Sequence, residues 1–188
     1  MTSKHLKVID HFLSDEECKK IIERFEAGPL EVVDRGIALY DRGMSDDPEL
    51  AALLFERVKP YLPKDYNGNP LTGCNSRFRF SRYQPKGEFM MHRDGVNRDP
   101  QGRYTGLTLN IFLNDERDGL VGGSTSFYNE DKSLHTKVPA QRGRAGLFDR
   151  EWRHTGDLVE DGLKYLLRTD VMVDYLTNLD LTNLGLSN

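Results

Sequence analysis

From residue 76 onward, short segments alternate apolar and polar residues, and this pattern restricts the possible folds more than any other feature of the sequence. In residues 107–113, leucine and isoleucine at every second position are separated by threonine, asparagine and phenylalanine. Side chains of a strand point alternately to its two faces, so a period of two indicates a strand. Further strands are expected around residue 138, at 146–148 and at 165–173, with glycine-rich turns between them. Many short strands with regular turns predict a mainly β sandwich, barrel or jelly roll.

The first 75 residues have a helical pattern instead. Ser14 and Glu17 form a capping-box motif that predicts the start of one helix, and Asp47 followed by Pro48 predicts the start of a second. The residues expected on the buried faces are Cys18, Ile21, Ile22 and Phe25 in the first helix and Leu50, Leu53, Leu54 and Val58 in the second. Short extended stretches are expected between them, at 30–33 and 36–40, and a turn-rich loop at 65–73.

Length and this change of pattern define the expected organisation. A chain of 188 residues and 21.6 kDa is long enough for one domain with one core. We therefore expect a single domain of residues 1–188, with a helical support region at 1–75, a β core at 76–175 and a C-terminal extension at 176–188.

Composition excludes several classes of protein. The net charge of −4 disfavours a dedicated nucleic-acid binder, so we expect no nucleic-acid partner. The apolar runs are too short to span a bilayer, and the first residues contain no apolar signal segment, so we expect no membrane partner and a cytoplasmic location. Two cysteines indicate a reduced compartment and exclude a cysteine-rich metal site. Any metal site must therefore use mainly carboxylates and the five histidines.

His92 and Asp94 are the first candidate metal ligands, because residues two apart on a strand point to the same face. His154 lies 62 residues later, and it can complete a facial triad if both segments belong to one barrel. Two histidines and one carboxylate leave coordination positions open, which suits non-haem Fe(II) that must bind a co-substrate and O₂. A histidine–carboxylate pair alone is common by chance, so the neighbouring residues must decide.

Four further side chains are candidates for holding a co-substrate. Lys164 lies ten residues after His154, where its ammonium can bind the far carboxylate of a dicarboxylic acid. Arg168, four residues later on the same face of the strand, is a second candidate carboxylate contact. Tyr83 and Thr125 offer hydroxyls that can complete the anchor. Each of these residues, taken alone, is more often structural.

Taken together, five segments resemble the 2-oxoglutarate/Fe(II)-dependent oxygenases of the prolyl 4-hydroxylase type. They lie in that family's order and cover roughly residues 76–173. The segments are 81–89 (SRYQPKGEF), 92–94 (HRD), 107–114 (LTLNIFLN), 122–127 (GGSTSF) and 154–164 (HTGDLVEDGLK). The resemblance implies a double-stranded β-helix, or jelly-roll, core at 76–175 that is supported by two or more N-terminal helices. It also implies Fe(II), 2-oxoglutarate and O₂ as cofactor and co-substrates.

Residue by residue, the resemblance implies that His92, Asp94 and His154 bind iron and are the catalytic centre. It implies that Lys164 pairs with the C5 carboxylate of 2-oxoglutarate. The hydroxyls of Tyr83 and Thr125 resemble the supporting groups of that co-substrate site. Arg168 belongs to the predicted site as well, but the resemblance implies no specific role for it. The related iron halogenases have glycine or alanine in place of the carboxylate, so an aspartate implies hydroxylation or another oxidation.

Three functions remain open at this point. The first is a dioxygenase that hydroxylates an unactivated C–H of a small molecule, such as an amino acid or natural product, and converts 2-oxoglutarate to succinate and CO₂. The second is the same chemistry on a protein, as in a prolyl hydroxylase. The third is a non-catalytic jelly-roll binding module. The substrate, the oligomeric state and the roles of Arg77, Arg79 and Arg82, which can bind an acidic substrate group or form outer salt bridges, also stay open.

Overall fold

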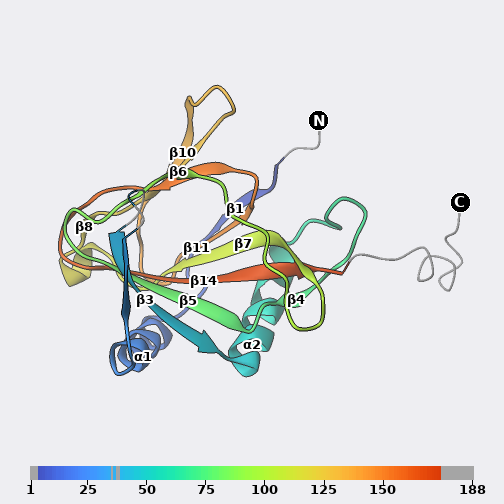
Figure 1. The fold of residues 1–188 in the computed structure, drawn as a ribbon, viewed down its shortest axis with the longest axis horizontal. Coiled ribbons are helices and arrows are strands. Elements are labelled where there is room, and N and C mark those ends of the chain that lie inside the picture. Colours follow the sequence, from blue (N-terminus) through green and yellow to red (C-terminus); the bar gives the residue numbers. More distant parts are fainter. Residues whose placement is uncertain (1–3, 35, 37–38, 175–188) are drawn as a thin grey trace, which may run out of the picture.

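The computed structural model describes residues 4–34, 36 and 39–174, which form two facing β-sheets with helices on the outer side of the larger sheet (Figure 1). The larger sheet has the order β1-β11-β7-β14-β5-β3-β2, and β4 pairs with one end of β14. The smaller sheet has the order β10-β9-β12-β6, and β8 pairs with β13. All strand pairings in the described part of the chain are antiparallel. The mainly β class is confirmed.

The elements have the following bounds. The larger sheet contains β1 (Leu6–Ile9), β2 (Glu31–Asp34), β3 (Leu39–Asp46), β4 (Leu71–Cys74), β5 (Arg77–Tyr83), β7 (Tyr104–Phe112), β11 (Ala145–Asp149) and β14 (Lys164–Val173). The smaller sheet contains β6 (Phe89–His92), β9 (Thr125–Tyr128), β10 (Leu134–Val138) and β12 (Arg153–Gly156), and the short pair is β8 (Val121–Gly122) with β13 (Val159–Asp161). The helices are α1 (Asp15–Glu26), α2 (Pro48–Val58) and the short 3₁₀ turns Lys59–Tyr61 and Glu116–Asp118.

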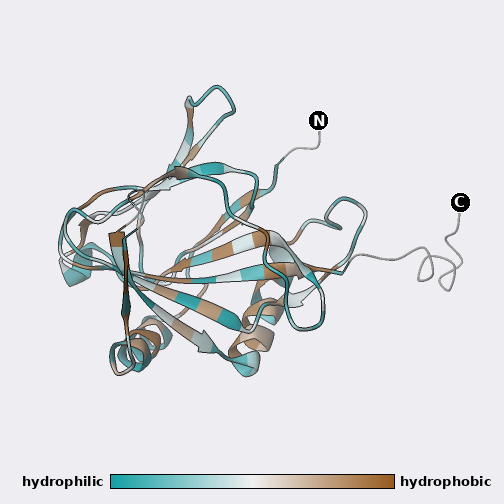
Figure 2. Cartoon of the chain, in the orientation of Figure 1, coloured by the Kyte–Doolittle hydropathy of each residue, from teal (hydrophilic) through white to brown (hydrophobic). Residues whose placement is uncertain are grey.

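Three neighbouring strands of the larger sheet separate an apolar face from a polar one. Along β7, Leu107, Leu109 and Ile111 are buried in the core beneath the helices, whereas Thr108 and Asn110 point to the other face. The same alternation runs along β5 and β14, and it is visible as alternating brown and teal bands in Figure 2. The helices therefore cover the apolar face, and the polar face is directed toward the smaller sheet.

Both predicted helix starts are confirmed. Ser14 and Glu17 form the two hydrogen bonds of a capping box at α1, and the Asp47 side chain accepts from the backbone N–H of Leu50 at α2. One predicted core position of α2 is wrong, because Leu53 is 44% exposed and the helix buries Ala51 instead. Successive residues of a helix lie about 100° apart, so Ala51, Leu54 and Val58 share one face and Leu53 points away from its centre.

Replacing Ser14 with alanine is expected to lower the free energy of unfolding by about 1 kcal/mol. The substitution removes the acceptor for the backbone N–H of Glu17 and leaves only the other bond of the capping box, from the backbone N–H of residue 14 to the Glu17 carboxylate. Urea denaturation monitored by circular dichroism measures the change. The control is Lys19→Ala on the same helix, which removes only an exposed ion pair of 3.9 Å and should change stability by less than about 0.5 kcal/mol. Equal effects of the two substitutions would contradict the capping role.

The N-terminal part contributes more than helices. Strands β1 to β4 all join the larger sheet, and β3 lies directly against β5. The predicted extension at 176–188 lies outside the described residues. Cys18 and Cys74 are both free and buried, and burial raises the pKa of their thiols to about 11 and about 12. Within the described ranges, no helix combines the length and apolar character that a membrane span requires.

Candidate metal and co-substrate site

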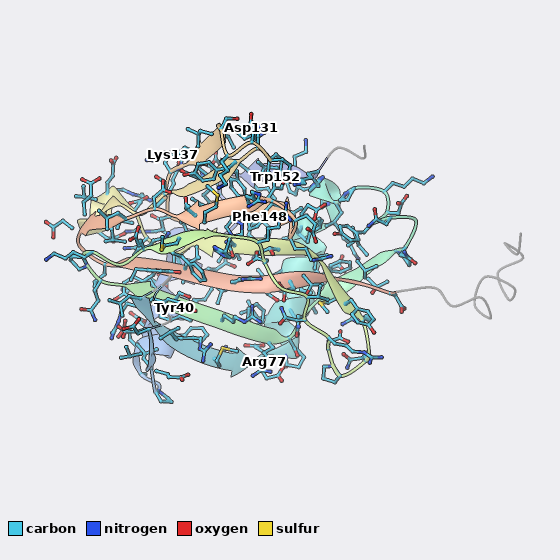
Figure 3. All side chains as sticks on the ribbon, turned by 45° about the horizontal axis from the view of Figure 1, so that its top comes forward. Tyr40, Arg77, Asp131, Lys137, Phe148 and Trp152 are labelled. Atoms are coloured by element: carbon cyan, nitrogen blue, oxygen red, sulfur yellow. The ribbon has the colours of Figure 1, made fainter. Side chains whose placement is uncertain are left out.

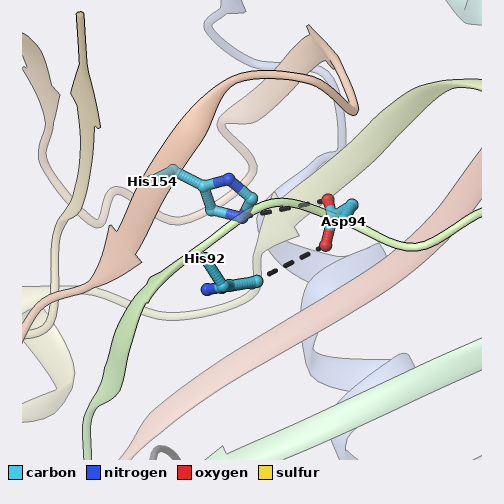
Figure 4. A group of neighbouring side chains, drawn as sticks. All are labelled: His92, Asp94 and His154. Carbon is cyan, nitrogen blue, oxygen red and sulfur yellow. Dashed lines mark ion pairs between the residues drawn. The ribbon is translucent and has the colours of Figure 1, made fainter. Parts of the chain in front are cut away.

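Three predicted ligands meet at the edge of the smaller sheet (Figure 4). His92 is the last residue of β6, and the pairing of β6 with β12 places it directly opposite His154. Asp94 follows two residues later, with its carboxylate oxygens 3.7 Å from Nε2 of His92 and 3.8 Å from Nε2 of His154. One candidate ligand atom from each residue lies within 4.8 Å of the others. The strand pairing thus assembles a two-histidine, one-carboxylate site.

Backbone carbonyls orient both imidazoles. Nδ1 of His92 lies 2.9 Å from the carbonyl oxygen of Met90, and Nδ1 of His154 lies 3.0 Å from that of Trp152. A carbonyl oxygen only accepts hydrogen bonds, so we assign the ring proton to Nδ1 in both residues. The Nε2 lone pairs then face Asp94. Burial lowers the pKa of His154 to about 4, which keeps its ring in the neutral form that a metal ion requires.

Asp94 is a buried carboxylate, 5% exposed, held from two sides. It accepts hydrogen bonds of 2.7 Å from Oγ1 of Thr108 and 2.6 Å from Nη1 of Arg168. Burial alone would raise the pKa of Asp94, but the guanidinium of Arg168, together with both histidines and Thr108, outweighs it and holds the pKa well below its usual range. Asp94 is therefore ionised and fixed in orientation, as a carboxylate ligand must be.

Lys164 is the most unusual charged residue in the described part of the chain. It is the first residue of β14, opposite Tyr83 of β5, and is 2% exposed. Its Nζ lies 5.1 Å from the ring centre of Tyr83 and 5.6 Å from that of Phe112, and it forms no ion pair or hydrogen bond among the described residues. Burial lowers its pKa to about 8, against a smaller opposing effect of Asp157. Burying an ammonium without a counterion is unfavourable, so this position fits a bound anion.

Except for Asp94, which lies buried beside it, the predicted site residues line a single cavity. The space not filled by protein atoms measures about 530 Å³, part of it open to solvent. The predicted residues in its wall are Tyr83, His92, Thr125, His154, Lys164 and Arg168. Gly123 lets the wall approach closely, because a Cβ there would lie 3.0 Å from Cδ of Lys164 and its φ of +67° disfavours other residues.

Several site residues were not singled out from the sequence. Tyr40 of β3 lines the cavity, as do Ser81 and Asn110. Thr108, which holds Asp94, was also missed. A signal existed for two of them: polar residues at every second position of the otherwise apolar segment 107–113 indicate a second buried face.

The three arginines of β5 separate. Arg79 lines the cavity, Arg77 is exposed, and Arg82 lies on the opposite face, where it pairs with Asp41 and Glu26.

The model of the 2OG-Fe(II) oxygenase superfamily matches residues 78–169. These residues include the triad and Lys164, so this part of the chain matches the superfamily. The protein is a 2-oxoglutarate-dependent dioxygenase that uses Fe(II), 2-oxoglutarate and O₂. The reading as a non-catalytic binding module is therefore wrong. No curated protein is significantly similar in sequence.

Solved structures of this oxygenase type share the fold. A viral collagen prolyl hydroxylase from Paramecium Bursaria Chlorella virus-1, in complex with 2OG, has a TM-score of 0.67 at 20% identity, over 92% of this chain and 98% of that one. A prolyl hydroxylase from Trichoplax adhaerens, bound to a hypoxia-inducible-factor peptide fragment, has a TM-score of 0.64 at 17% identity, over 97% and 87%. The carbocyclase SnoK of nogalamycin biosynthesis has a TM-score of 0.60 at 17% identity, over 91% and 80%. The jelly-roll core is confirmed.

Proposed function

We propose that this dioxygenase hydroxylates an unactivated C–H of a small molecule, such as an amino acid or natural product, while 2-oxoglutarate is decarboxylated to succinate and CO₂. His92, Asp94 and His154 hold the Fe(II), which supplies the O₂-dependent oxidation when bound. The observation that carries the proposal is the buried ammonium of Lys164, which has no counterion among the described residues and lines the same cavity as both histidines. A protein that bound only a metal ion would not need it.

Lys164 binds the C5 carboxylate of 2-oxoglutarate in this proposal. The hydroxyls of Tyr83 and Thr125 line the same cavity, and Tyr83 lies opposite Lys164 in the strand pairing. Arg168 keeps Asp94 oriented through Nη1 and bonds Asp170 through Nη2, while its Nε is buried without a hydrogen-bond partner among the described residues. This N–H is one donor of Arg168 that is available to the co-substrate.

Apolar side chains shield His154 from water. The rings of Phe127 and Phe148 lie 5.7 Å and 5.0 Å from the ring of His154, and Phe148 and Trp152 are both buried (Figure 3). A dry environment strengthens the interactions of the charged groups inside the cavity and limits side reactions of the oxidant.

The position of the cavity favours a small molecule, because its wall is formed by strands of both sheets, with Tyr83 and Arg168 on one side and His92 and Thr125 on the other. A peptide substrate is the second candidate. Met90 and Val96, on either side of the first two ligands in sequence, are 50% and 52% exposed and form an apolar margin on which a peptide can pack. Among proteins of this fold, one acts in natural-product biosynthesis and another binds a peptide, so both substrate classes are compatible with the scaffold.

Anaerobic titration with Fe(II) and 2-oxoglutarate tests the proposal. The wild type is expected to develop the visible metal-to-ligand charge-transfer band of a chelated 2-oxoglutarate, and His92→Ala should lack it. Succinate release, screened with free amino acids and with proline-rich peptides, then separates the two substrate classes. Failure of the wild type to bind iron or 2-oxoglutarate would refute the proposal, and stimulation by peptides alone would favour the second candidate.

A further inference from the structure

A row of three polar side chains crosses the larger sheet beside the triad. The strand pairing places Arg168 of β14 directly between Arg79 of β5 and Asn110 of β7. All three line the cavity that contains both histidines. Side chains at paired positions of neighbouring strands point to the same face and lie close together, so two guanidinium groups are adjacent here.

The two arginines differ in how their charge is compensated. Arg168 pairs with Asp94 at 2.6 Å and with Asp170 at 3.3 Å. Arg79 forms no ion pair with any described carboxylate, and its side-chain hydrogen bond goes to the neutral amide oxygen of Asn97, at 2.8 Å. Burial and the neighbouring Arg168 lower the pKa of Arg79 from its ordinary value, which shows that its charge is poorly accommodated in this state. An anion bound at Arg79 would relieve this.

Arg79 also lies where an incoming molecule would pass. It lines both the cavity of the triad and a second cavity beside it, whose wall includes Arg77 and Arg98. Two of the three acidic residues in that wall are engaged with other groups: Asp99 pairs with Arg103, and Asp170 pairs with Arg168 and accepts from Asn97. The third, Asp46, is exposed and lies opposite Arg77 in the pairing of β3 with β5. Arg79 is the arginine that the two cavities share.

We propose that Arg79 binds a carboxylate of the primary substrate, and that the enzyme therefore oxidises a carboxylic acid at a carbon near that group. This inference rests on the proposed function, because it assigns Lys164 to 2-oxoglutarate. The two cations start from separate places on the sheet: Arg79 lies four residues before Tyr83, the partner of Lys164, and four residues of strand span about 13 Å between Cα atoms. A charge-assisted, two-pronged contact with a carboxylate is the interaction that arginine forms best.

Arginine-detected NMR of the full chain tests this inference. The protein, labelled with nitrogen-15, is loaded with Zn(II) and 2-oxoglutarate so that no turnover occurs, and propionate is the probe. The Nε–Hε signal of Arg79, assigned from its absence in Arg79→Gln, is expected to shift saturably with propionate and not with the uncharged propionamide. Absence of a saturable shift up to about 0.1 M propionate, or an equal shift with propionamide, would overturn the inference.

Variants show whether the carboxylate is held by this one residue. In calorimetric titrations, Arg79→Gln should weaken propionate binding by at least about tenfold, and Arg79→Lys should restore part of it. The matched control is Arg77→Gln, which removes the same charge from the same face of β5 at an exposed position and should leave propionate affinity within about twofold. Equal losses of propionate affinity in the two glutamine variants would indicate general electrostatic attraction rather than a binding site, and would overturn the inference.

The source of the carboxylate is settled by two further probe sets. Free L-amino acids and their C-terminal amides represent a small-molecule acid, and a capped tripeptide with a central aspartate, compared with its asparagine analogue, represents an acidic side chain. If the affinity for the charged probe of either set depends on Arg79, the inference is supported and that set identifies the source. If no charged probe binds more tightly than its uncharged analogue, the inference is refuted. Binding of 2-oxoglutarate is followed in the same samples, so its loss identifies failure of the proposed function separately.

Discussion

Replacing Asp94 with alanine is expected to abolish Fe(II) binding at micromolar metal and to lower 2-oxoglutarate turnover by more than about 100-fold. Changing a partner that merely orients a metal ligand already costs 10- to 100-fold, and loss of the ligand itself should exceed that. The effect has a second part in this protein. Asp94 is the principal counterion of Arg168, so the substitution also leaves a buried guanidinium with only Asp170 beside it.

The two parts can be separated by measurement. Iron content after desalting and succinate formation report on the ligand, and thermal unfolding of the metal-free protein reports on the buried charge. Asp94→Asn keeps the shape and an acceptor for Thr108, but removes the charge that Arg168 needs. Glu88→Gln, an exposed acidic residue close to β6, serves as the control and should behave like the wild type. Full iron occupancy in Asp94→Ala would contradict the assignment of this ligand.

Part of the site was predictable from strand periodicity. Lys164 and Arg168 lie four residues apart on β14, so a period of two places them on the same face. The same reasoning was incomplete for His92 and Asp94, because β6 ends at His92 and Asp94 lies in the segment after it. The same rule separates Arg82 from Arg77 and Arg79, since it falls on the other face, and the structure shows it in a salt-bridge network with Asp41 and Glu26. That distinction was available from the sequence alone.

Other features depend on contacts between distant segments, which no local pattern encodes. Tyr40 reaches the cavity only because β3 pairs with β5, and nothing in residues 39–46 indicates that partner. The separation of Arg77 from Arg79 likewise needs the register, because both lie on one face and only Arg79 is flanked by Arg168. The buried face of α2 was also predicted incompletely, because Leu53 is exposed and Ala51 is buried. Burial in a strand or helix is decided by what packs against it.

Lys164→Met is the second large expected effect, and it should act in opposite directions on binding and on stability. The substitution removes the anchor for a carboxylate, so the dissociation constant for 2-oxoglutarate should rise by about 10- to 100-fold, equivalent to about 1.4–2.7 kcal/mol for one charge-assisted contact. It also replaces a buried ammonium, which has no counterion within the described ranges, with an apolar chain of similar length. The metal-free, ligand-free variant should therefore be more stable than the wild type.

The pH dependence gives this prediction its sharpest form. Burial lowers the pKa of Lys164 to about 8 in the folded state, against an ordinary value of 10.5, so the unfolded chain binds more protons between these values. The contribution of Lys164 to the free energy of unfolding should thus be lowest below pH 8, increase up to about pH 10.5, and vanish in Lys164→Met. Binding of 2-oxoglutarate should follow the opposite course, because above pH 8 the free enzyme must take up a proton to present an ammonium, and affinity should fall by up to about tenfold per pH unit.

Lys164→Arg separates charge from titration. A guanidinium stays protonated throughout this range, so the variant should retain measurable 2-oxoglutarate binding while losing the component of its pH dependence that comes from residue 164. Calorimetric titration of 2-oxoglutarate into the Zn(II)-loaded proteins from pH 7 to 10, together with urea unfolding of the metal-free proteins over the same range, measures both quantities. If Lys164→Met binds 2-oxoglutarate as tightly as the wild type, the anchor lies elsewhere. If it is instead destabilised, the ammonium must already have a compensating partner, and the reason for expecting an anion at this position disappears.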